Sequence, residues 1–488
     1  MENSKKVFGN KIDELYYLDA CLTKRRYTLK FGDDTKLTYH LKATPNPILN
    51  KYFNVQDLTR SNKKLELPEN AVIIGNIRMG FGHYRIAMAM ASCANALGYT
   101  PYWLDLVSFE DTSGGKLISY LNKLYSLGSR LSQHSALFDK LLWEPGSKNA
   151  YKKLYSNAID QKNSELMTRV YQDLPKSVPF VATHSWPAQA AVHAGLTAVV
   201  NAIPDNFPIA LHLAEGSLHT VQTPSSYLGY KTLFDMGQGK MKTMTEKDIV
   251  TAGHYVDHEI VSNIDIDCKR RIKRMKENKP IRFLIPVGGA GAGLEMIEHI
   301  LKHLMPYVKE KKACIFLNLG DHKNVLEEII KKVPEFKKIA YFHANNFNAT
   351  ETFCTRASYD EDLNGIHVFY HKNIFAAVYS TNLLMRQTDV MITKPSELAF
   401  YPIPKMLIRR VGAHEAYGAL RSAELGDGTI ECRTYSQSSQ MLDMLLNERQ
   451  NITKMCENIM KANKIHIYDG SYIAVKEAVK LSKKVEGT

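Results

Sequence analysis

The chain has 488 residues, of which 44% are hydrophobic and 23% charged, so its length and composition indicate a globular protein of two or three domains. A formal net charge of +13 calls for an anionic partner: nucleotide phosphates, an anionic lipid surface or nucleic acid. The seven cysteines are scattered without a Cys-x-x-Cys pair, which argues against both a disulfide framework and a zinc knuckle.

The cysteine pattern and the hydropathy of the chain predict a cytoplasmic protein in a reducing compartment. No apolar run reaches the length of a membrane span, and the opening sequence MENSKKVFGNKIDE lacks the apolar core of a signal peptide. Basic residues are dispersed and carry no RNA-recognition or helix-turn-helix signature, so we do not expect nucleic acid as the partner.

Residues 1–66 precede the first clear α/β pattern and are predicted to form a small extension. Apolar and polar residues alternate over residues 27–31 and again over residues 37–41, on either side of a Gly-Asp-Asp-Thr sequence. Alternation on both sides of a turn predicts a β-hairpin. Residues 61–68 are polar and indicate a linker.

A strand, loop, helix and strand pattern then opens the first doubly wound domain. Residues 71–76 form an apolar run, a loop with Gly80 and Gly82 follows, and residues 84–97 have a helical composition. The glycines permit close approach of a ligand, and His83 stands at the helix start, where free N–H groups favour anions. Taken alone, His83 is more often a capping residue, and Gly-x-Gly is a weak signal.

The rest of this domain offers one apolar stripe and one acidic residue. Residues 116–143 carry apolar side chains at helical spacing with lysine and arginine between them, the pattern either of a core helix or of a basic amphipathic surface that touches a membrane. Asp205 follows the strand predicted at residues 197–203 and lies in a loop.

A polar, basic stretch at residues 257–279 indicates a domain boundary, after which a second α/β pattern begins. Residues 281–287 form a buried strand, and a glycine-rich loop at residues 288–293 precedes a helix. Bare backbone N–H groups at such a loop suit a phosphate, although no P-loop sequence is present. The predicted divisions are an extension at residues 1–66, Rossmann-like domains at residues 67–262 and 263–465, and a C-terminal helix at residues 466–488.

Polar side chains follow two later strands of the second domain. An apolar run at residues 390–392 ends in Lys394, Ser396 and Glu397, and another at residues 406–408 is followed by a loop that contains His414 and Glu415. Because ligands bind at the carboxyl ends of parallel strands, this rim is the first candidate for a site. A helix cap with a solvated ion pair would produce the same local pattern.

Two α/β halves that each open with a glycine loop, together with the Thr393-Lys394 strand end and the Ala413-His414-Glu415 loop, resemble the GT-B glycosyltransferases. The nearest likeness is to the monogalactosyldiacylglycerol synthases, the processive diacylglycerol glucosyltransferases and the peptidoglycan lipid-intermediate N-acetylglucosaminyltransferase. The resemblance covers the chain from about residue 71 onward. It implies two Rossmann-like domains facing across a cleft, and inverting, metal-independent transfer of a sugar from a nucleotide diphosphate donor, UDP being expected, to a hydroxyl acceptor such as a lipid.

The resemblance also implies roles for individual residues. His83 would be the general base, and Asp205 a weaker catalytic candidate. The donor would be bound by the second domain, through Gly288, Gly289, Gly291, Gly293, Lys394, Ser396, Glu397, His414 and Glu415. No metal and no cofactor besides the sugar nucleotide is expected. A lipid acceptor would suit peripheral contact with an anionic inner membrane face.

Other functions remain open on the sequence alone. One is a nucleotide-sugar 2-epimerase on the same fold, and another is a non-catalytic nucleotide-sugar-binding protein. The sequence has Pro395-Ser396-Glu397 where the family usually has more glycine, and Gly418 where it usually has asparagine. These departures leave the donor base and sugar open.

Overall fold

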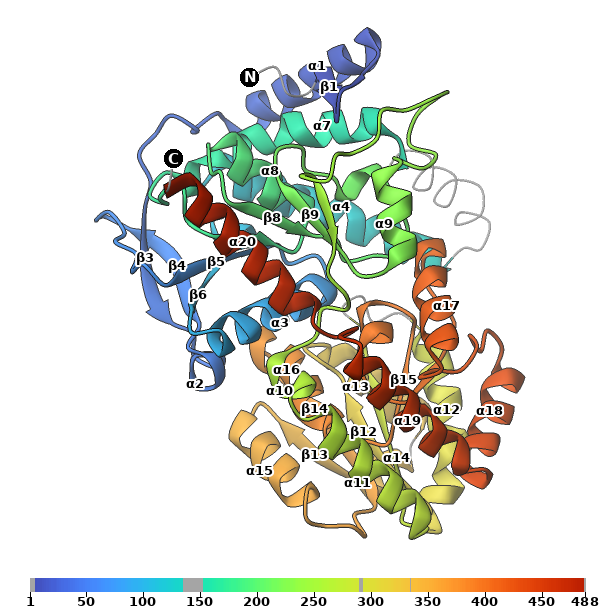
Figure 1. Ribbon diagram of the computed structural model, residues 1–488. Helices are drawn as coiled ribbons and strands as arrows, with labels where there is room; N and C mark the ends of the chain where they lie inside the picture. The colour runs from blue at the N-terminus through green and yellow to red at the C-terminus, as the bar shows by residue number, and fades with distance from the viewer. Residues whose placement is uncertain (1–4, 135–151, 289–292, 334, 487–488) are drawn as a thin grey trace. The chain divides into compact units, whose positions relative to one another are not determined.

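The computed structural model describes residues 5–134, 152–288, 293–333 and 335–486 (Figure 1). The chain divides into two compact units. Unit 1 consists of Met1–Met79, Ile86–Tyr255 and Asp469–Thr488, and unit 2 consists of Gly80–Arg85 and Val256–Tyr468.

Unit 1 is built on a sheet in the order β10-β9-β8-β7-β5-β6-β4-β3, in which only the β3–β4 pair is antiparallel. Its strands are β3 (His40–Pro45), β4 (Gln56–Ser61), β5 (Ala71–Asn76), β6 (Thr100–Asp105), β7 (Phe180–Ala182), β8 (Val199–Ala202), β9 (Leu218–Val221) and β10 (Ile249–Thr251). A short separate pair joins β1 (Lys6–Val7) and β2 (Asn10–Lys11). The helices are α1 (Glu14–Phe31), α2 (Asn50–Phe53), α3 (Gly82–Ala96), which starts in unit 2, α4 (Ser113–His134), α7 (Leu154–Ser164), α8 (Ser185–His193), α9 (Pro224–Lys231) and α20 (Gly470–Glu486), with short 3-10 turns η2 (Leu106–Ser108), η4 (Glu165–Tyr171) and η5 (Ala210–His212).

Unit 2 is built on an entirely parallel sheet in the order β13-β14-β12-β11-β15-β16. Its strands are β11 (Ile281–Pro286), β12 (Ala313–Asn318), β13 (Ala340–Ala344), β14 (Gly365–Tyr370), β15 (Val390–Thr393) and β16 (Lys405–Leu407). The helices are α10 (His258–Val261), α11 (Ile264–Lys276), α12 (Leu294–Lys309), α13 (Lys323–Lys332), α14 (Phe336–Ile339), α15 (Phe347–Ala357), α16 (Ile374–Met385), α17 (Ala416–Leu425), α18 (Tyr435–Asn447) and α19 (Gln450–Lys464), with 3-10 turns η6 (Glu397–Phe400) and η7 (Ala413–Glu415).

The sheet of unit 2 is covered on both faces. Phe283 and Ile285 of β11 pack into the core on the side of α12 and α18. Leu284, between them, packs into the core on the side of α11, α15 and α19. Successive side chains of a strand point to opposite faces, so a strand that is apolar throughout requires both cores. The predicted α/β class of the GT-B type, with two Rossmann-like doubly wound units, is confirmed by this topology.

The predicted β-hairpin at residues 27–41 is wrong. Residues 14–31 form α1, which begins after Asp13, whose carboxylate accepts the Leu15 N–H, and ends at Gly32 with φ 87°. Tyr27 and Phe31 lie one helical turn apart on the buried side, with ring centroids 6.1 Å apart, while Leu29 between them is 81% exposed. A five-residue window with period 2 is too short to separate a strand from a helix.

Residues 1–66 are also not an appendage. This region holds two antiparallel pairs, β1 with β2 and β3 with β4, and β4 joins the main sheet in parallel beside β6, with Gln56 opposite Tyr102. The predicted boundary at residues 262/263 falls instead between Tyr255 and Val256. The predicted C-terminal helix exists as α20, but it belongs to unit 1, where it packs against β7, β8 and β9 (Figure 1).

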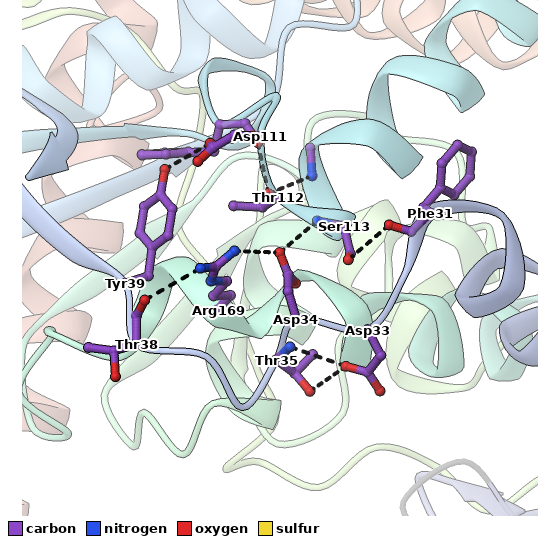
Figure 2. A network of polar contacts seen from close by, with 12 residues as sticks. Phe31, Asp33, Asp34, Thr35, Thr38, Tyr39, Asp111, Thr112, Ser113 and Arg169 are labelled. Carbon is purple, nitrogen blue, oxygen red and sulfur yellow. Dashed lines mark hydrogen bonds and ion pairs between the residues drawn. The ribbon is translucent and has the colours of Figure 1, made fainter.

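A polar network ties residues 31–39 to α4 and η4 (Figure 2). The Asp34 carboxylate accepts the Ser113 N–H at the start of α4 at 3.0 Å and the Arg169 guanidinium at 2.8 Å. Asp34 and Arg169 are largely buried, with side chains 12% and 14% exposed. The Arg169 guanidinium also lies over the Tyr39 ring at 4.9 Å. One carboxylate therefore joins three separate segments of unit 1.

We predict that Asp34→Ala destabilises the protein by about 1–3 kcal/mol, because the variant leaves Arg169 and the α4 terminus without their acceptor. Asp33→Ala is the matched control. Asp33 accepts from Thr35 within its own turn, so its loss should cost clearly less. Thermal unfolding of both variants measures the difference, and equal effects would contradict the assignment.

Candidate functional site

The chain direction of unit 2 creates one place where ligands are expected. From β11 the chain passes to β12 and then to β13 at the edge of the sheet, returns to β14 between these two, and crosses to the other side of β11 as β15. The connections that follow β11 and β15 thus leave these adjacent strands in opposite directions. In doubly wound sheets the ligand binds at the carboxyl ends of the strands at such a switch point.

Two predicted residues meet at this switch point. Gly288 follows β11 and Lys394 follows β15, and a Cβ atom on Gly288 would lie 3.3 Å from Lys394 Cε. The absence of a side chain at Gly288 therefore leaves room for the lysine stem. The His322 ring, from the loop after β12, donates its Nε2–H to the Gly288 carbonyl at 2.9 Å.

Lys394 forms an ion pair with the predicted residue Glu415, at 2.5 Å from Nζ to Oε1. The second carboxylate oxygen of Glu415 accepts the Val411 N–H at 2.7 Å. Glu415 is 6% exposed, and burial by itself would raise its pKa. The Lys394 charge and these hydrogen bonds outweigh burial and lower the pKa, so Glu415 is ionised at neutral pH. A cation and an anion are thus held together at the rim.

The Gly80–Gly82 loop packs against the same rim. Phe81 lies against the His322 ring, with centroids 5.4 Å apart, and against Gly320, where a Cβ atom would lie 2.4 Å from the Phe81 ring. A Cβ atom on Gly82 would lie 3.1 Å from Glu397 Oε2. The structure therefore brings the Gly80–Gly82 loop, Gly288, Lys394, Glu397 and Glu415 into one set of contacts.

Arg85 anchors this loop. Its guanidinium is nearly fully buried and lies 3.4 Å from Glu397 Oε1. It also donates to Asn382 Oδ1 at 3.1 Å and to the Thr381 hydroxyl at 3.4 Å, both on α16. Asn318 at the end of β12 donates to the same hydroxyl at 2.9 Å. A buried charge requires such a set of partners, so the loop is held in one position.

Other predicted residues have less defined places. His83 is the second residue of α3 and is partly exposed, and its role as a base stays a prediction. Gly293 precedes α12 with φ 82°. The Ser396 N–H donates to the Lys394 carbonyl at 2.9 Å, and the His414 ring packs on Gly412, where a Cβ atom would lie 2.3 Å from it. Gly289 and Gly291 lie outside the described residues.

Asp205 lies in unit 1 after β8. Its carboxylate is 3.4 Å from His212 Nε2, and the other ring nitrogen of His212 is 2.8 Å from the Tyr230 hydroxyl. Tyr230 in turn donates to the Phe207 carbonyl at 2.9 Å. This chain of contacts fixes the loop after β8. A catalytic role for Asp205 stays a prediction.

The sequence interpretation missed His322, Phe81 and Arg85. A signal for His322 was present, since Gly320-Asp321-His322 comes shortly after the apolar run that forms β12, at the same edge of the sheet as Lys394. Phe81 stands between the two loop glycines. Arg85 carried no signal, because its partners are almost 300 residues away in the chain. Among the described residues no group of three or more His, Cys, Asp or Glu side chains is arranged to hold a metal ion.

Two family models match the chain. Residues 6–232 match the one described as Domain of unknown function (DUF6937), and residues 244–479 match the one described as Domain of unknown function (DUF6938). The second match covers the part of unit 2 from Val256 to Tyr468, together with adjoining residues of unit 1. The interval between the two matches lies just before the end of unit 1 at Tyr255. No curated protein matches the chain.

Several solved structures are similar over most of the chain. UDP-GlcNAc 2-epimerase from Neisseria meningitidis, bound to UDP-GlcNAc, has a TM-score of 0.46 at 10% identity, covering 86% of this chain and 100% of its own. A UDP-forming trehalose-phosphate synthase from Burkholderia xenovorans has a TM-score of 0.43 at 10% identity, covering 86% of this chain and 100% of its own. A glycosyltransferase from Rickettsia africae has a TM-score of 0.40 at 14% identity, covering 86% of this chain and 99% of its own. The order and direction of the strands in the two sheets carry the fold assignment. The described part of the chain has no helix long and apolar enough to cross a bilayer.

A buried carboxyl beside Arg85 predicts a pH dependence of stability. Asp257 is fully buried. Burial, and then the Glu259 charge, raise the pKa of its carboxyl to about 7. The Tyr401 hydroxyl, which donates to Asp257 at 2.8 Å, and the Arg85 charge lower this pKa only in part. In the unfolded chain the pKa is about 4. The folded state therefore holds a proton between pH 4 and 7 that the unfolded state has lost, and stability falls as the pH rises through this window.

The side chain in Asp257→Asn cannot ionise. We predict that the melting temperature of this variant minus that of the parent is a few degrees larger at pH 8 than at pH 5. Glu457→Gln, at an exposed position of α19, is the control and should show no such trend. Melting curves at both pH values make the comparison. A difference between Asp257→Asn and parent that does not change with pH would contradict the raised pKa.

Proposed function

We propose that this protein is an inverting, metal-independent glycosyltransferase that moves a sugar from a UDP-sugar donor to an acceptor hydroxyl. The observation that carries the proposal is the meeting of Gly288, Lys394 and Glu415 at the switch point of unit 2. Of the acceptors that the resemblance implies, we take a lipid as the first to test.

The donor diphosphate is assigned to the space beside Lys394. The side chain of Lys394 is 28% exposed, so its ammonium faces the rim while its stem crosses Gly288. The N-terminus of α12 follows the same loop and adds free N–H groups with a favourable dipole. Together they supply positive potential over the leaving diphosphate. Glu415, which is paired with Lys394 in this structure, is assigned to accept hydrogen bonds from hydroxyl groups of the UDP-sugar, either of its ribose or of its sugar.

The chemical step is assigned to His83. An imidazole near neutral pH accepts the proton of the acceptor hydroxyl while the new C1–O bond forms and the C1–O bond to the diphosphate breaks. UDP leaves with the electron pair. His83 directly follows Gly82, whose loop is anchored within unit 2 by Arg85 and Phe81. In this proposal the anchoring keeps the base near the donor rim.

We predict that millimolar UDP raises the melting temperature by a few degrees, because a ligand at one hundred times its Kd stabilises the folded state by about 2.7 kcal/mol. Lys394→Met and Glu415→Gln should each abolish most of the shift. Lys302→Met, at an exposed position of α12, is the matched control and should keep it. If UDP, GDP and dTDP all leave the parent protein unshifted, the proposal fails.

We further predict that His83→Ala keeps the UDP shift but loses at least about a hundredfold in UDP release from a UDP-sugar in the presence of lipid extract. Mass spectrometry of the product identifies the acceptor. Formation of a C2-epimerised sugar nucleotide without any acceptor would instead make the protein an epimerase. If His83→Ala releases UDP at the same rate as the parent, His83 is not the general base.

A further inference from the structure

The outer face of α1 carries a leucine stripe, Leu15, Leu18, Leu22 and Leu29. Their side chains are 77%, 54%, 54% and 81% exposed. The spacing of three and four residues, with Arg25 filling the remaining place before Leu29, is the heptad pattern of a helix that packs against another helix. A shallow surface groove along this face is lined by Leu22, Arg25, Arg26, Leu29 and Lys30.

The opposite face of α1 is already in use. Tyr16 stacks on Tyr155 of α7, with centroids 4.2 Å apart, and Lys24 pairs with Glu165 of η4 at 2.5 Å. Ala20 is completely buried. The helix is therefore fixed to unit 1 by this face, and the leucine stripe lies on its exposed face. Contiguous exposed leucines on a fixed element mark an interaction surface.

The charges beside the stripe are divided by sign along the helix. Glu14 and Asp19 stand in its first half, whereas Arg25, Arg26 and Lys30 stand in its second half, and all five are exposed. A second helix of the same sequence, running in the opposite direction, would set each acidic half against a basic half. This division therefore suits an antiparallel partner with the same sequence.

We propose that the α1 stripe is a self-association surface, on which a second copy of this chain packs its own α1 in antiparallel orientation about a two-fold axis at Leu22. Residues equally far before and after position 22 then face each other. Leu15 meets Leu29, Leu22 meets Leu22, Asp19 meets Arg25 and Glu14 meets Lys30. Such a contact is isologous, since each pair away from the axis occurs twice.

Leu18 meets Arg26 in this arrangement, and the aliphatic stem of the arginine covers the leucine while its guanidinium reaches water. An anionic bilayer is the competing occupant. It would attract the basic half of the face but repel Glu14 and Asp19, whereas a second copy satisfies both halves. The charge pattern therefore favours the second copy.

The first test measures the molar mass of the full chain by light scattering at a series of protein concentrations. We expect reversible dimers in the parent, and at least about tenfold weaker association in Leu22→Lys, which places two like charges at the axis. Leu228→Lys, at a 62% exposed position of α9, is the matched control and should still dimerise. Unchanged melting temperatures verify that both variants fold. A monomeric parent at about 100 µM, or a Leu22→Lys dimer as strong as the parent, would overturn the proposal.

The second test uses the two-fold symmetry. Asp19→Arg and Arg25→Glu should each associate weakly alone, because each sets like charges against each other twice. Mixed together they should dimerise, since the arginine introduced in one chain then faces the glutamate introduced in the other, while the native Arg25 faces the native Asp19. A mixture no stronger than its components would contradict the antiparallel register.

Two further outcomes separate this surface from others. In a Cys21→Ser background, a short bismaleimide should link Leu22→Cys to itself and leave Leu15→Cys unlinked, because facing helices lie about 8–10 Å apart only where their positions coincide. Asp19→Arg should not increase sedimentation with phosphatidylserine vesicles. If it does, and the parent also binds them, the face is a membrane surface and the proposal is wrong.

Discussion

The order of strands in unit 2 is the constraint on which the candidate site depends. Because β12 and β14 lie on one side of β11 and β15 lies on the other, the connections after β11 and β15 leave the sheet edge in opposite directions. Gly288 and Lys394 follow the ends of these two strands, and the other contacts of the site are arranged around this pair. The sheet supplies the position, and the side chains supply the charge.

Two buried charges with different partners hold the rim together. Glu415 is kept ionised by Lys394 and by backbone N–H groups, whereas Arg85 spreads its charge over Glu397 and the polar side chains of α16. The Lys394 side chain of the first pair is 28% exposed, and in the proposed function it exchanges Glu415 for an anionic ligand. The second lies deeper and positions the Gly80–Gly82 loop. This division between an exchangeable pair and a fixed one is what a binding site on a rigid scaffold requires.

Much of this architecture could be predicted from the sequence, because buried parallel strands are short and almost wholly apolar. The strands at β5, β11 and β15 were recognisable for that reason, and so were the glycine loops after the first two. At this edge Lys394 and Glu415 form an ion pair, whereas Glu397 pairs with Arg85. Contacts between distant segments carried no such signal, as with Arg85 and Asn382, or with α20 and the sheet of unit 1. Local alternation misled at residues 27–31, where burial against α4 and α7 selects a helix that leaves Leu29 in solvent.

A crystal structure of the full chain with bound UDP tests the central claim most directly. We expect the diphosphate to lie within hydrogen-bond reach of Lys394 Nζ and the N-terminus of α12, with Glu415 released from Lys394 toward a hydroxyl of the nucleotide. A nucleotide bound at the end of β5 or elsewhere in unit 1, with the Lys394–Glu415 pair intact, would contradict it.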